Sequence, residues 1–238
     1  MSAGTFPQAL KLDIRLQHKY GFVYAAIFSS LLWEVFVYLL PDDSHPMALP
    51  YLIFGDLAII GFFIVAGAVF FERGERTLFA LLVTPMRFGS YYAAKLVTLT
   101  ALSLVMAAII AVSGVGLGFN LFAFVTGVVL CTLLFLMCSF ISATPFTGIT
   151  EWILPSTVVL AVLNIPLLSY SGLWDSYLPY VIPTQGAILL LGESFGRVAM
   201  EPWQWVYAVG YPLLWLGLLA VVSRKMFYKH IVASEGSE

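Results

Sequence analysis

Residues 50–76 read PYLIFGDLAIIGFFIVAGAVFFERGER, and this stretch decides the fold. Its first 22 residues carry one charged side chain, that of Asp56, whereas four of the next five residues are charged. A helix needs about 20 mostly apolar residues to cross a hydrocarbon core of roughly 30 Å. The stretch therefore predicts a transmembrane helix that ends near Phe71, followed at once by a charged segment outside the membrane.

Five further apolar runs of similar length lie on either side of this one. The predicted spans are residues 20–40, 50–71, 91–112, 120–141, 151–170 and 203–222. The chain of 238 residues is 61% hydrophobic and only 10% charged, whereas soluble domains carry about 25% charged residues. Composition and spacing together predict an all-α integral membrane protein, with six transmembrane helices in a single domain over residues 1–238.

The basic residues fall almost entirely on one of the two sides that these spans define. Nine of the eleven Lys and Arg residues lie before the first span, between the second and third, or after the sixth; Lys95 lies at the start of the third span on the same side, and only Arg197 lies on the other side. Loops rich in Lys and Arg resist translocation and stay in the cytoplasm. The asymmetry predicts that both termini are cytoplasmic. The basic clusters are typical of contacts with anionic membrane lipids, and no basic tract indicates nucleic-acid binding.

Residues 5–19, ahead of the first span, are predicted to form an interfacial helix. The stretch from Leu10 to Gln17 alternates between apolar and polar residues, a period of two that formally favours a strand. An isolated strand beside a membrane would leave its edges unpaired, whereas an interfacial helix can extend Lys and Arg to water from either flank. Thr5 ahead of Pro7 also has the pattern of a helix start.

Residues 72–90 contain a second segment that does not span the membrane. Leu78, Leu81 and Leu82 are spaced to form one apolar helical stripe, and Pro85 ends it. The sequence predicts a short amphipathic helix on the cytoplasmic side, between the second and third spans.

Residues 172–202 form a third such segment. Its interior from Tyr180 to Leu191 is too apolar for a solvated loop and too short to span, and prolines and glycines interrupt it. Such a run is typical of a re-entrant or interfacial hairpin on the outer side.

Three polar residues inside the spans are candidate functional groups: Glu34, Asp56 and Asn164. Each intramembrane carboxylate costs about 2.5–3.5 kcal/mol on insertion scales, so it calls for a reason. Glu34 and Asp56 both fall toward the outer leaflet, where they either contact a polar substrate or a proton, or are buried and bonded to a neighbouring Tyr or Ser. Asn164, just before Pro166, marks either a kink or a pore contact.

The residues needed for catalysis are missing from the sequence. All three histidines lie in flanks of the spans, which leaves no intramembrane base for a serine nucleophile and no metal site. Cys131 and Cys138 fall on one face of an apolar run and are interpreted as packing residues. No phosphate-binding glycine loop that ends in Lys and Ser or Thr is present, so the chain cannot hydrolyse ATP alone.

The charged segment and its apolar stripe carry a resemblance to a known family. The stretch ERGERTLFALLVTP at residues 72–85, followed by YYAAK at residues 91–95, resembles a signature of type 2 ABC exporter permeases. The opening LDIRLQHKYGF at residues 12–22 is similar to small actinobacterial-type permeases assigned to fluoroquinolone export. The resemblance extends over nearly the whole chain.

The resemblance implies a function and a set of partners. Residues 72–90 would be the coupling helix that docks on a separate nucleotide-binding subunit, which binds ATP and Mg²⁺, while this chain holds no cofactor. Two permease chains, identical or sister, would pair in the bacterial cytoplasmic membrane to export a hydrophobic drug or lipid-like molecule. The implied coupling residues are Glu72, Arg73, Glu75, Arg76, Thr77, Leu78, Leu81, Leu82 and Pro85, and the implied outer gate residues are Pro183, Thr184 and Gly186.

One rival function remains open at the level of the sequence. Glu34 and Asp56 would also suit a secondary transporter driven by protons. Such a transporter would not need a cytoplasmic helix with a partner-binding face, which the stripe of residues 78–82 predicts here.

Overall fold

The computed structural model describes residues 5–75, 88–174 and 176–232, and these ranges contain helices and turns but no strand. Six of the helical stretches are long and apolar enough to cross a membrane. The prediction of an all-α membrane protein with six spans is therefore confirmed. The α-helices are α1 (Thr5–Lys19), α2 (Phe22–Leu39), α3 (His45–Ile59), α4 (Val65–Gly74), α6 (Phe88–Val115), α7 (Leu121–Ala143), α8 (Ile149–Asn164), α9 (Pro166–Tyr170), α10 (Thr184–Ser194) and α11 (Pro202–Phe227). Shorter turns are the 3₁₀ helices η1 (Asp42–Ser44) and η3 (Leu178–Val181) and the π-helices η2 (Ile60–Ile64) and η4 (Tyr228–Val232).

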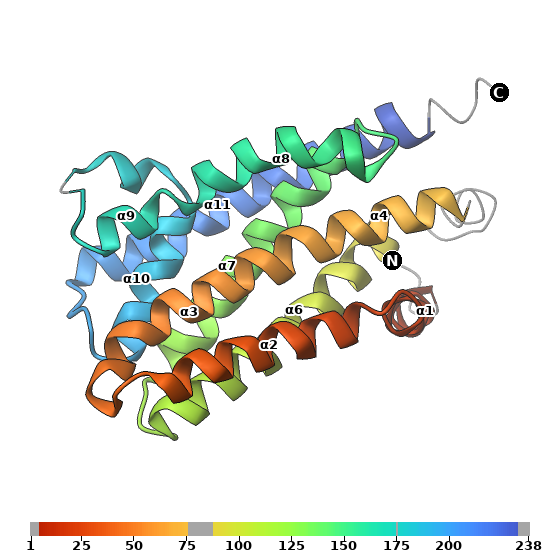
Figure 1. Ribbon diagram of the computed structural model, residues 1–238. Coiled ribbons are helices and arrows are strands. Elements are labelled where there is room, and N and C mark those ends of the chain that lie inside the picture. The colour runs from red at the N-terminus through yellow and green to blue at the C-terminus, as the bar shows by residue number, and fades with distance from the viewer. Residues whose placement is uncertain (1–4, 76–87, 175, 233–238) are drawn as a thin grey trace.

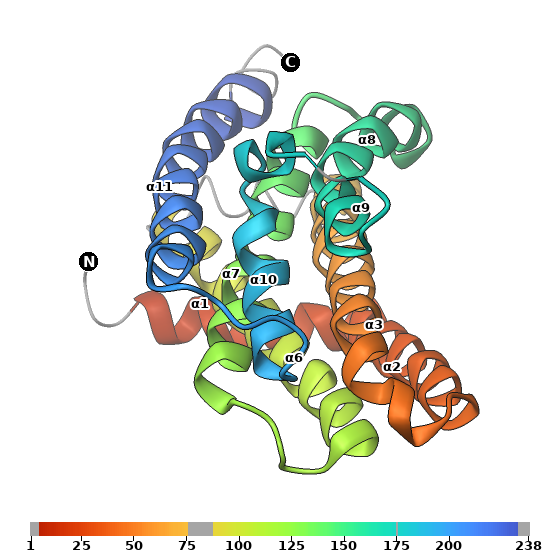
Figure 2. The ribbon, with the colours of Figure 1, turned by 90° about the vertical axis from the view of Figure 1, so that its left-hand side faces the viewer.

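The helices form one elongated bundle with α7 and α10 in its middle (Figures 1 and 2). α1 lies across one end of the bundle, and the last turns of α4 and α11 lie at the same end (Figure 1). We call this the α1 end, and the opposite end, where α9 and α10 lie, the α10 end. In the most apolar stretch of the second span, 78% of the residues are buried inside the chain, whereas only 22% are buried in the corresponding stretches of the first, fifth and sixth spans. The second span is thus part of the protein core, while α2, α8 and α11 present apolar faces outward.

The second span begins earlier than the sequence pattern predicts. The sequence predicts a second span at residues 50–71, but α3 already begins at His45, and the candidate span runs from Asp42 to Gly74. Pro46 lies in the first turn of α3, where its missing N–H would have no intrahelical partner in any case. This proline therefore starts the helix and does not separate it from the turn.

The second span also contains a π-helical turn, η2, between α3 and α4. Gly61 in this turn packs closely against α7, because a Cβ built there would lie 3.0 Å from the Cβ of Phe135. The turn therefore coincides with a close approach of the second span to the central helix α7.

A single histidine joins three helices at the α10 end. The Nδ1 atom of His45 lies 2.8 Å from the carbonyl oxygen of Gly114 in α6, and its Nε2 atom lies 3.1 Å from that of Val37 in α2. Both partners are carbonyls near helix C-termini, where carbonyl oxygens lack the usual intrahelical donors, and that of Val37 also accepts from the N–H of Leu40 at 3.2 Å. His45 thereby fixes the start of α3 to the ends of α2 and α6.

Residues 5–19 form a helix, so the strand that their alternation formally favoured is not present. Ala9, Asp13 and Gln17 are buried and recur every four residues, which places them on one face of α1. The alternating pattern failed because two of the buried side chains are polar. The location of α1 at a membrane surface stays a prediction.

α10 occupies the middle of segment 172–202. All of its residues except Glu193 are buried, and it packs against α7 and α11. The apolar interior of this segment is thus covered by protein, which removes the need for solvent or lipid contact. Whether the segment re-enters a membrane stays a prediction.

Candidate functional site

Lys95 lies at the centre of a buried ionic cluster at the α1 end. Its Nζ atom is 2.9 Å from Asp13 Oδ1 in α1 and 2.7 Å from Glu72 Oε1 in α4, and the lysine itself is 1% exposed. A buried ammonium without counter-charges would be strongly unfavourable. The two carboxylates meet that requirement, so one side chain of α6 holds α1 and α4 together.

Each carboxylate oxygen in this cluster has a donor. Gln17 donates to Asp13 Oδ2 at 2.6 Å, and the hydroxyl of Tyr91 donates to Glu72 Oε2. The remaining two oxygens accept from Lys95. We call Asp13, Gln17, Glu72, Tyr91 and Lys95 the saturated cluster, because no oxygen of its carboxylates lacks a partner.

Helical spacing explains how the chain assembles the saturated cluster. Asp13 and Gln17 are four residues apart on α1, and Tyr91, Lys95 and Thr98 follow the i, i+4, i+7 pattern on α6. Gln17 also donates to the hydroxyl of Thr98 at 2.7 Å. Two polar faces, one on each helix, therefore meet at their crossing.

The structure places Glu72 in the protein interior, with 0% exposure. Its carboxylate accepts from the hydroxyl of Tyr91 and from Lys95, so it is already bonded within the chain. Its assignment to the coupling region stays a prediction, and any such role is indirect.

Arg73 connects α4 to two distant parts of the chain. Its guanidinium donates to the carbonyl oxygens of Thr144 and Phe146, after α7, and to that of His230 at 2.8 Å, after α11. Charge-assisted bonds of this kind are stronger than neutral ones. Arg73 therefore fastens the last turn of α4 to the loop before α8 and to the C-terminal helix.

Glu75 is exposed and belongs to a looser pair. It accepts from Lys19 at 2.6 Å and from the hydroxyl of Tyr20 at 3.0 Å. These bonds, with that from Lys19 contributing most, lower the pKa of Glu75 below its ordinary value of 4.5. The pair ties the end of α1 to the end of α4 near water.

The remaining predicted coupling residues lie outside the described residues: Arg76, Thr77, Leu78, Leu81, Leu82 and Pro85. The two helices that flank this segment in the sequence are α4 and α6. These are the helices that the saturated cluster joins to α1.

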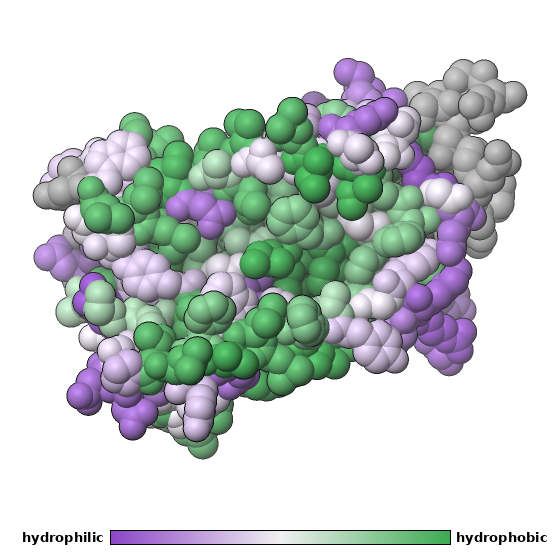
Figure 3. Space-filling view, in the orientation of Figure 1, coloured by the Kyte–Doolittle hydropathy of each residue, from purple (hydrophilic) through white to green (hydrophobic). Residues whose placement is uncertain are grey.

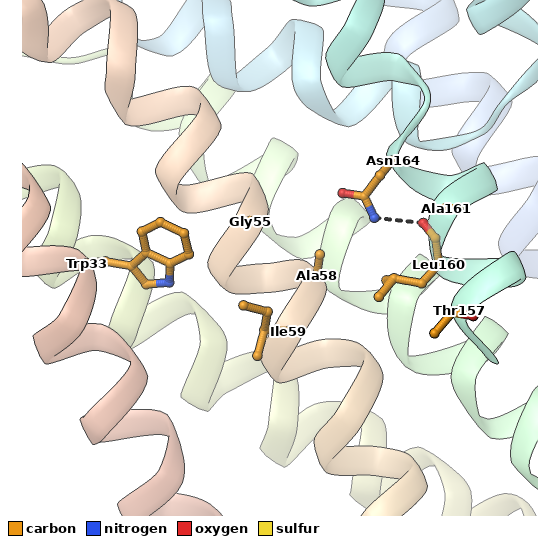
Figure 4. Close-up of a pocket in the computed structure, with 8 residues that line it drawn as sticks. All are labelled: Trp33, Gly55, Ala58, Ile59, Thr157, Leu160, Ala161 and Asn164. Carbon is orange, nitrogen blue, oxygen red and sulfur yellow. Dashed lines mark hydrogen bonds between the residues drawn. The ribbon is translucent and has the colours of Figure 1, made fainter. Parts of the chain in front are cut away.

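A pocket of about 440 Å³ forms the second candidate site. It lies between α2, α3 and α8, on the face where a hollow separates two apolar ridges (Figures 3 and 4). Drug-sized ligands occupy pockets of about 300–1,000 Å³. The lining residues are Trp33, Gly55, Ala58, Ile59, Thr157, Leu160, Ala161 and Asn164.

Asp56 follows the lining residue Gly55 but does not itself line the pocket. It is 0% exposed, and its Oδ1 atom accepts from the hydroxyl of Ser29 at 2.7 Å, while its Oδ2 atom has no partner. Glu34, beside Trp33 on α2, is half-buried, and its Oε1 atom is also without a partner. Both carboxylates thus face protein, and a bond to a neighbouring Ser, one of the two sequence interpretations, is present at Asp56.

Asn164 both ends a helix and lines the pocket. α8 stops at this residue and α9 begins at Pro166, so the predicted break in the fifth span is confirmed. The amide nitrogen donates to the carbonyl oxygen of Leu160 at 2.7 Å, and the amide oxygen points toward the interior of the pocket (Figure 4).

The three predicted gate residues are buried where α10 begins. Pro183 precedes α10, and the hydroxyl of Thr184 donates to the carbonyl oxygen of Leu163 at 2.6 Å. At Gly186 a Cβ would lie 2.7 Å from the carbonyl oxygen of Ala208, so α10 and α11 approach each other closely there. A gating role for these residues stays a prediction.

Sequence reasoning missed two important arrangements. Lys95 was noted only as part of a motif, although a lysine beside an apolar span signals that buried acidic partners exist. Trp33 gave no signal of its own, because the sequence does not show which face of α2 is turned toward α8. Among the described residues, no group of His, Cys, Asp and Glu side chains forms a metal site.

Six membrane-length helices packed around a buried centre, with one pocket open on a flank, define a multi-pass helical membrane protein. The sequence model of the Fluoroquinolones export permease protein family matches residues 5–235. The chain belongs to this family.

Two curated relatives agree with that assignment. Both are named fluoroquinolones export permease proteins, from Mycobacterium tuberculosis strains CDC 1551 / Oshkosh and ATCC 25618 / H37Rv. Each is 44% identical over 229 residues, which cover 96% of this chain and 97% of the relative. No solved structure matches the chain.

Proposed function

We propose that the chain is the transmembrane subunit of an ATP-driven exporter, energised by a separate nucleotide-binding subunit. The observation that carries the proposal is the saturated cluster. It fixes α4 and α6, the two helices on either side of residues 76–87, to each other and to α1. The family and the relatives support an export permease.

The energy source follows from what the chain contains. The sequence has no phosphate-binding loop, and ATP with its Mg²⁺ would therefore be bound by the partner. A partner that pulled on residues 76–87 would act on α4 and α6 together, because their charges are paired in a buried and fully bonded arrangement. The excess of basic residues at this end supports a cytoplasmic location for it, on the side where ATP is available.

The pathway would lie on the face that carries the pocket. α2 and α8 border this face, and their spans are mostly uncovered within the single chain. A second permease chain, identical or sister, would cover it and enclose a central route. ATP binding and release by the partner subunits would then rock the pair between inward-facing and outward-facing states. The relatives are named for fluoroquinolone export, so we expect drug-like cargo here as well.

A proton-driven exporter is the second candidate. The unpartnered Oδ2 atom of Asp56 favours it, because a buried carboxylate can exchange a proton. The two candidates differ in what they require, since the first needs an ATPase subunit and the second needs only a proton gradient.

The test uses inside-out vesicles that contain the chain with or without a co-expressed ABC ATPase subunit from the same genome. Uptake of a fluoroquinolone should require both the subunit and ATP, and should survive collapse of the proton gradient. Uptake that needs the gradient and ignores ATP would favour the second candidate. Saturable ATP binding by the purified chain alone would contradict the first.

Leu81→Asp and Leu82→Asp test the predicted docking stripe. A carboxylate in that stripe would be desolvated against the partner, at a cost of several kcal/mol. Co-purification with the ATPase subunit and ATP-dependent uptake should both fall. Leu117→Asp is the matched control, because Leu117 is 86% exposed in the turn at the α10 end. Unchanged co-purification in both stripe variants would show that docking occurs elsewhere.

A further inference from the structure

We propose that the pocket between α2, α3 and α8 binds the ammonium group of an amphiphilic amine against the ring of Trp33, with Asp56 as its counter-charge. The inference rests on the proposed function in one respect, namely that the bound amine is the exported cargo. The binding site itself follows from the charges and hydrogen-bond partners around the pocket.

Asp56 has no counter-charge among the described residues. Its carboxylate is fully buried with one donor, Ser29, and one free oxygen. The ion pairs among the described residues are Lys19–Glu75, Lys95–Asp13 and Lys95–Glu72, none of which includes Asp56. A buried carboxylate retains its charge only when a positive group approaches it. A cationic ligand supplies that group.

The second argument is the position of Trp33. Its indole lines the pocket and lies beside Asp56, and it packs 3.4 Å from the place where a Cβ of Gly55 would be. The indole therefore touches the pocket on one side and neighbours the buried carboxylate, which does not itself line the pocket. A cation held against a tryptophan face is attracted by the ring itself, and most strongly at a desolvated site. Asp56 beside the ring, with Glu34 next to it on α2, adds to that attraction.

The third argument comes from the wall on α8. The amide nitrogen of Asn164 is bonded to the carbonyl oxygen of Leu160, which leaves the amide oxygen directed into the pocket (Figure 4). This oxygen offers the ligand a hydrogen-bond acceptor. An ammonium N–H is the complementary donor for that oxygen.

The fourth argument is the apolar remainder of the lining. Ala58, Ile59 and Leu160 offer no polar side-chain atoms, and the pocket volume of about 440 Å³ exceeds what an ammonium group alone would fill. The ligand must therefore carry an apolar body, which these side chains contact while the cation meets Trp33 and Asn164.

The experiment measures binding to the purified chain without any ATPase subunit, by quenching of tryptophan fluorescence and by calorimetry. The probes are 4-benzylpiperidine, a cation at neutral pH, and its neutral N-acetyl derivative. The cation should bind at least about tenfold more tightly than the amide, because only the cation is attracted by the Trp33 ring and by the negative charge of Asp56 beside it. Asp56→Asn should abolish that preference and leave binding of the amide unchanged.

Matched variants separate charge from folding. Asp43→Asn removes an exposed carboxylate at the α10 end and should leave both affinities as they are. Trp33→Leu should weaken the cation more than the amide, and Asn164→Leu should weaken the cation several-fold. Thermal unfolding of each variant verifies that it is folded.

Three results would overturn the inference: equal affinity for the two probes, a cation affinity that Asp56→Asn does not change, or no binding of either probe. Each can occur while ATP-driven uptake in vesicles is normal, so failure of this inference is distinct from failure of the proposed function. Conversely, selective cation binding without ATP-driven uptake would retain the site and reject the energy source.

Discussion

The saturated cluster and the pocket use carboxylates in opposite ways. At the α1 end, all four oxygens of Asp13 and Glu72 accept hydrogen bonds, and Lys95 balances part of their charge. Beside the pocket, Asp56 has one donor, a free oxygen and no cation. Buried networks in which every polar atom is bonded make a structure rigid. A buried polar atom without a hydrogen-bond partner instead indicates a place where a ligand can supply that partner. This difference supports the two proposals above, in which the α1 end transmits movement from the partner and the pocket binds the ligand.

The largest effect is expected from Lys95→Met. The variant would leave Asp13 and Glu72 buried without their positive partner, which costs about 3–5 kcal/mol. Denaturant unfolding of the purified protein, followed by circular dichroism, measures the loss. The triple variant Asp13→Asn, Glu72→Gln, Lys95→Met removes all three charges and should recover most of the stability. If Lys95→Met unfolds like the wild type, the carboxylates of the saturated cluster do not depend on their positive partner, and they no longer differ from Asp56 in this respect.

Arg73→Met should have the next largest effect. It removes a charged donor from the carbonyl oxygens of Phe146 and His230, at a cost of about 2 kcal/mol. The same unfolding assay applies, with Arg224→Met as a control at an exposed arginine of α11. Equal losses in the two variants would mean that the dense bonding at the α1 end stops at the saturated cluster.

Asp56→Leu should behave in the opposite way from Lys95→Met. Its stability is expected within about 1 kcal/mol of the wild type, since removal of an unpaired buried carboxylate offsets the lost bond to Ser29. Transport of an amine should nevertheless fall at least about tenfold. Asp56→Asn and Glu34→Gln should likewise reduce transport without reducing expression. A destabilised Asp56→Leu protein with normal transport would make this carboxylate structural.

The smallest effect is expected at the exposed pair of Lys19 and Glu75. Because the pKa of Glu75 is lowered in the folded protein, its bonds stabilise the fold above its ordinary pKa of 4.5, and this contribution disappears as the pH falls through the lowered value. Thermal unfolding of the wild type and of Glu75→Gln should differ slightly at pH 7 and converge in acid. A difference that grows in acid would contradict a lowered pKa of Glu75 in the folded protein.

The sequence predicted the fold well, because hydropathy and charge asymmetry act locally. Six spans, a helical segment before the first of them and a break at Asn164 all agree with the structure. The start of α3 was misjudged, since Pro46 has the same pattern as a turn proline until its place in the first helical turn is known.

The candidate sites were predicted only in part. Asp56, Glu34 and Asn164 are conspicuous as polar residues in apolar runs, but the pairing of Asp13 with Lys95 joins residues 82 positions apart. No local pattern encodes that distance. The role of Trp33 likewise depends on which face of α2 meets α3 and α8, and this is decided by packing between helices.

The π-helical turn η2 determines how α4 is rotated relative to α3 about the axis of the second span. An α-helix advances about 100° per residue, so one additional residue in a wide turn rotates everything beyond it by a comparable amount. Gly55 and Ala58 on one side of η2 line the pocket, while Glu72 on the other side enters the saturated cluster. Deletion of a single residue within Ile60–Ile64 would keep Glu72, Lys95 and all the pocket residues in the sequence and yet turn Glu72 away from Lys95. The rotation of one half of the second span relative to the other, about the helix axis, is therefore set by this single π-helical turn.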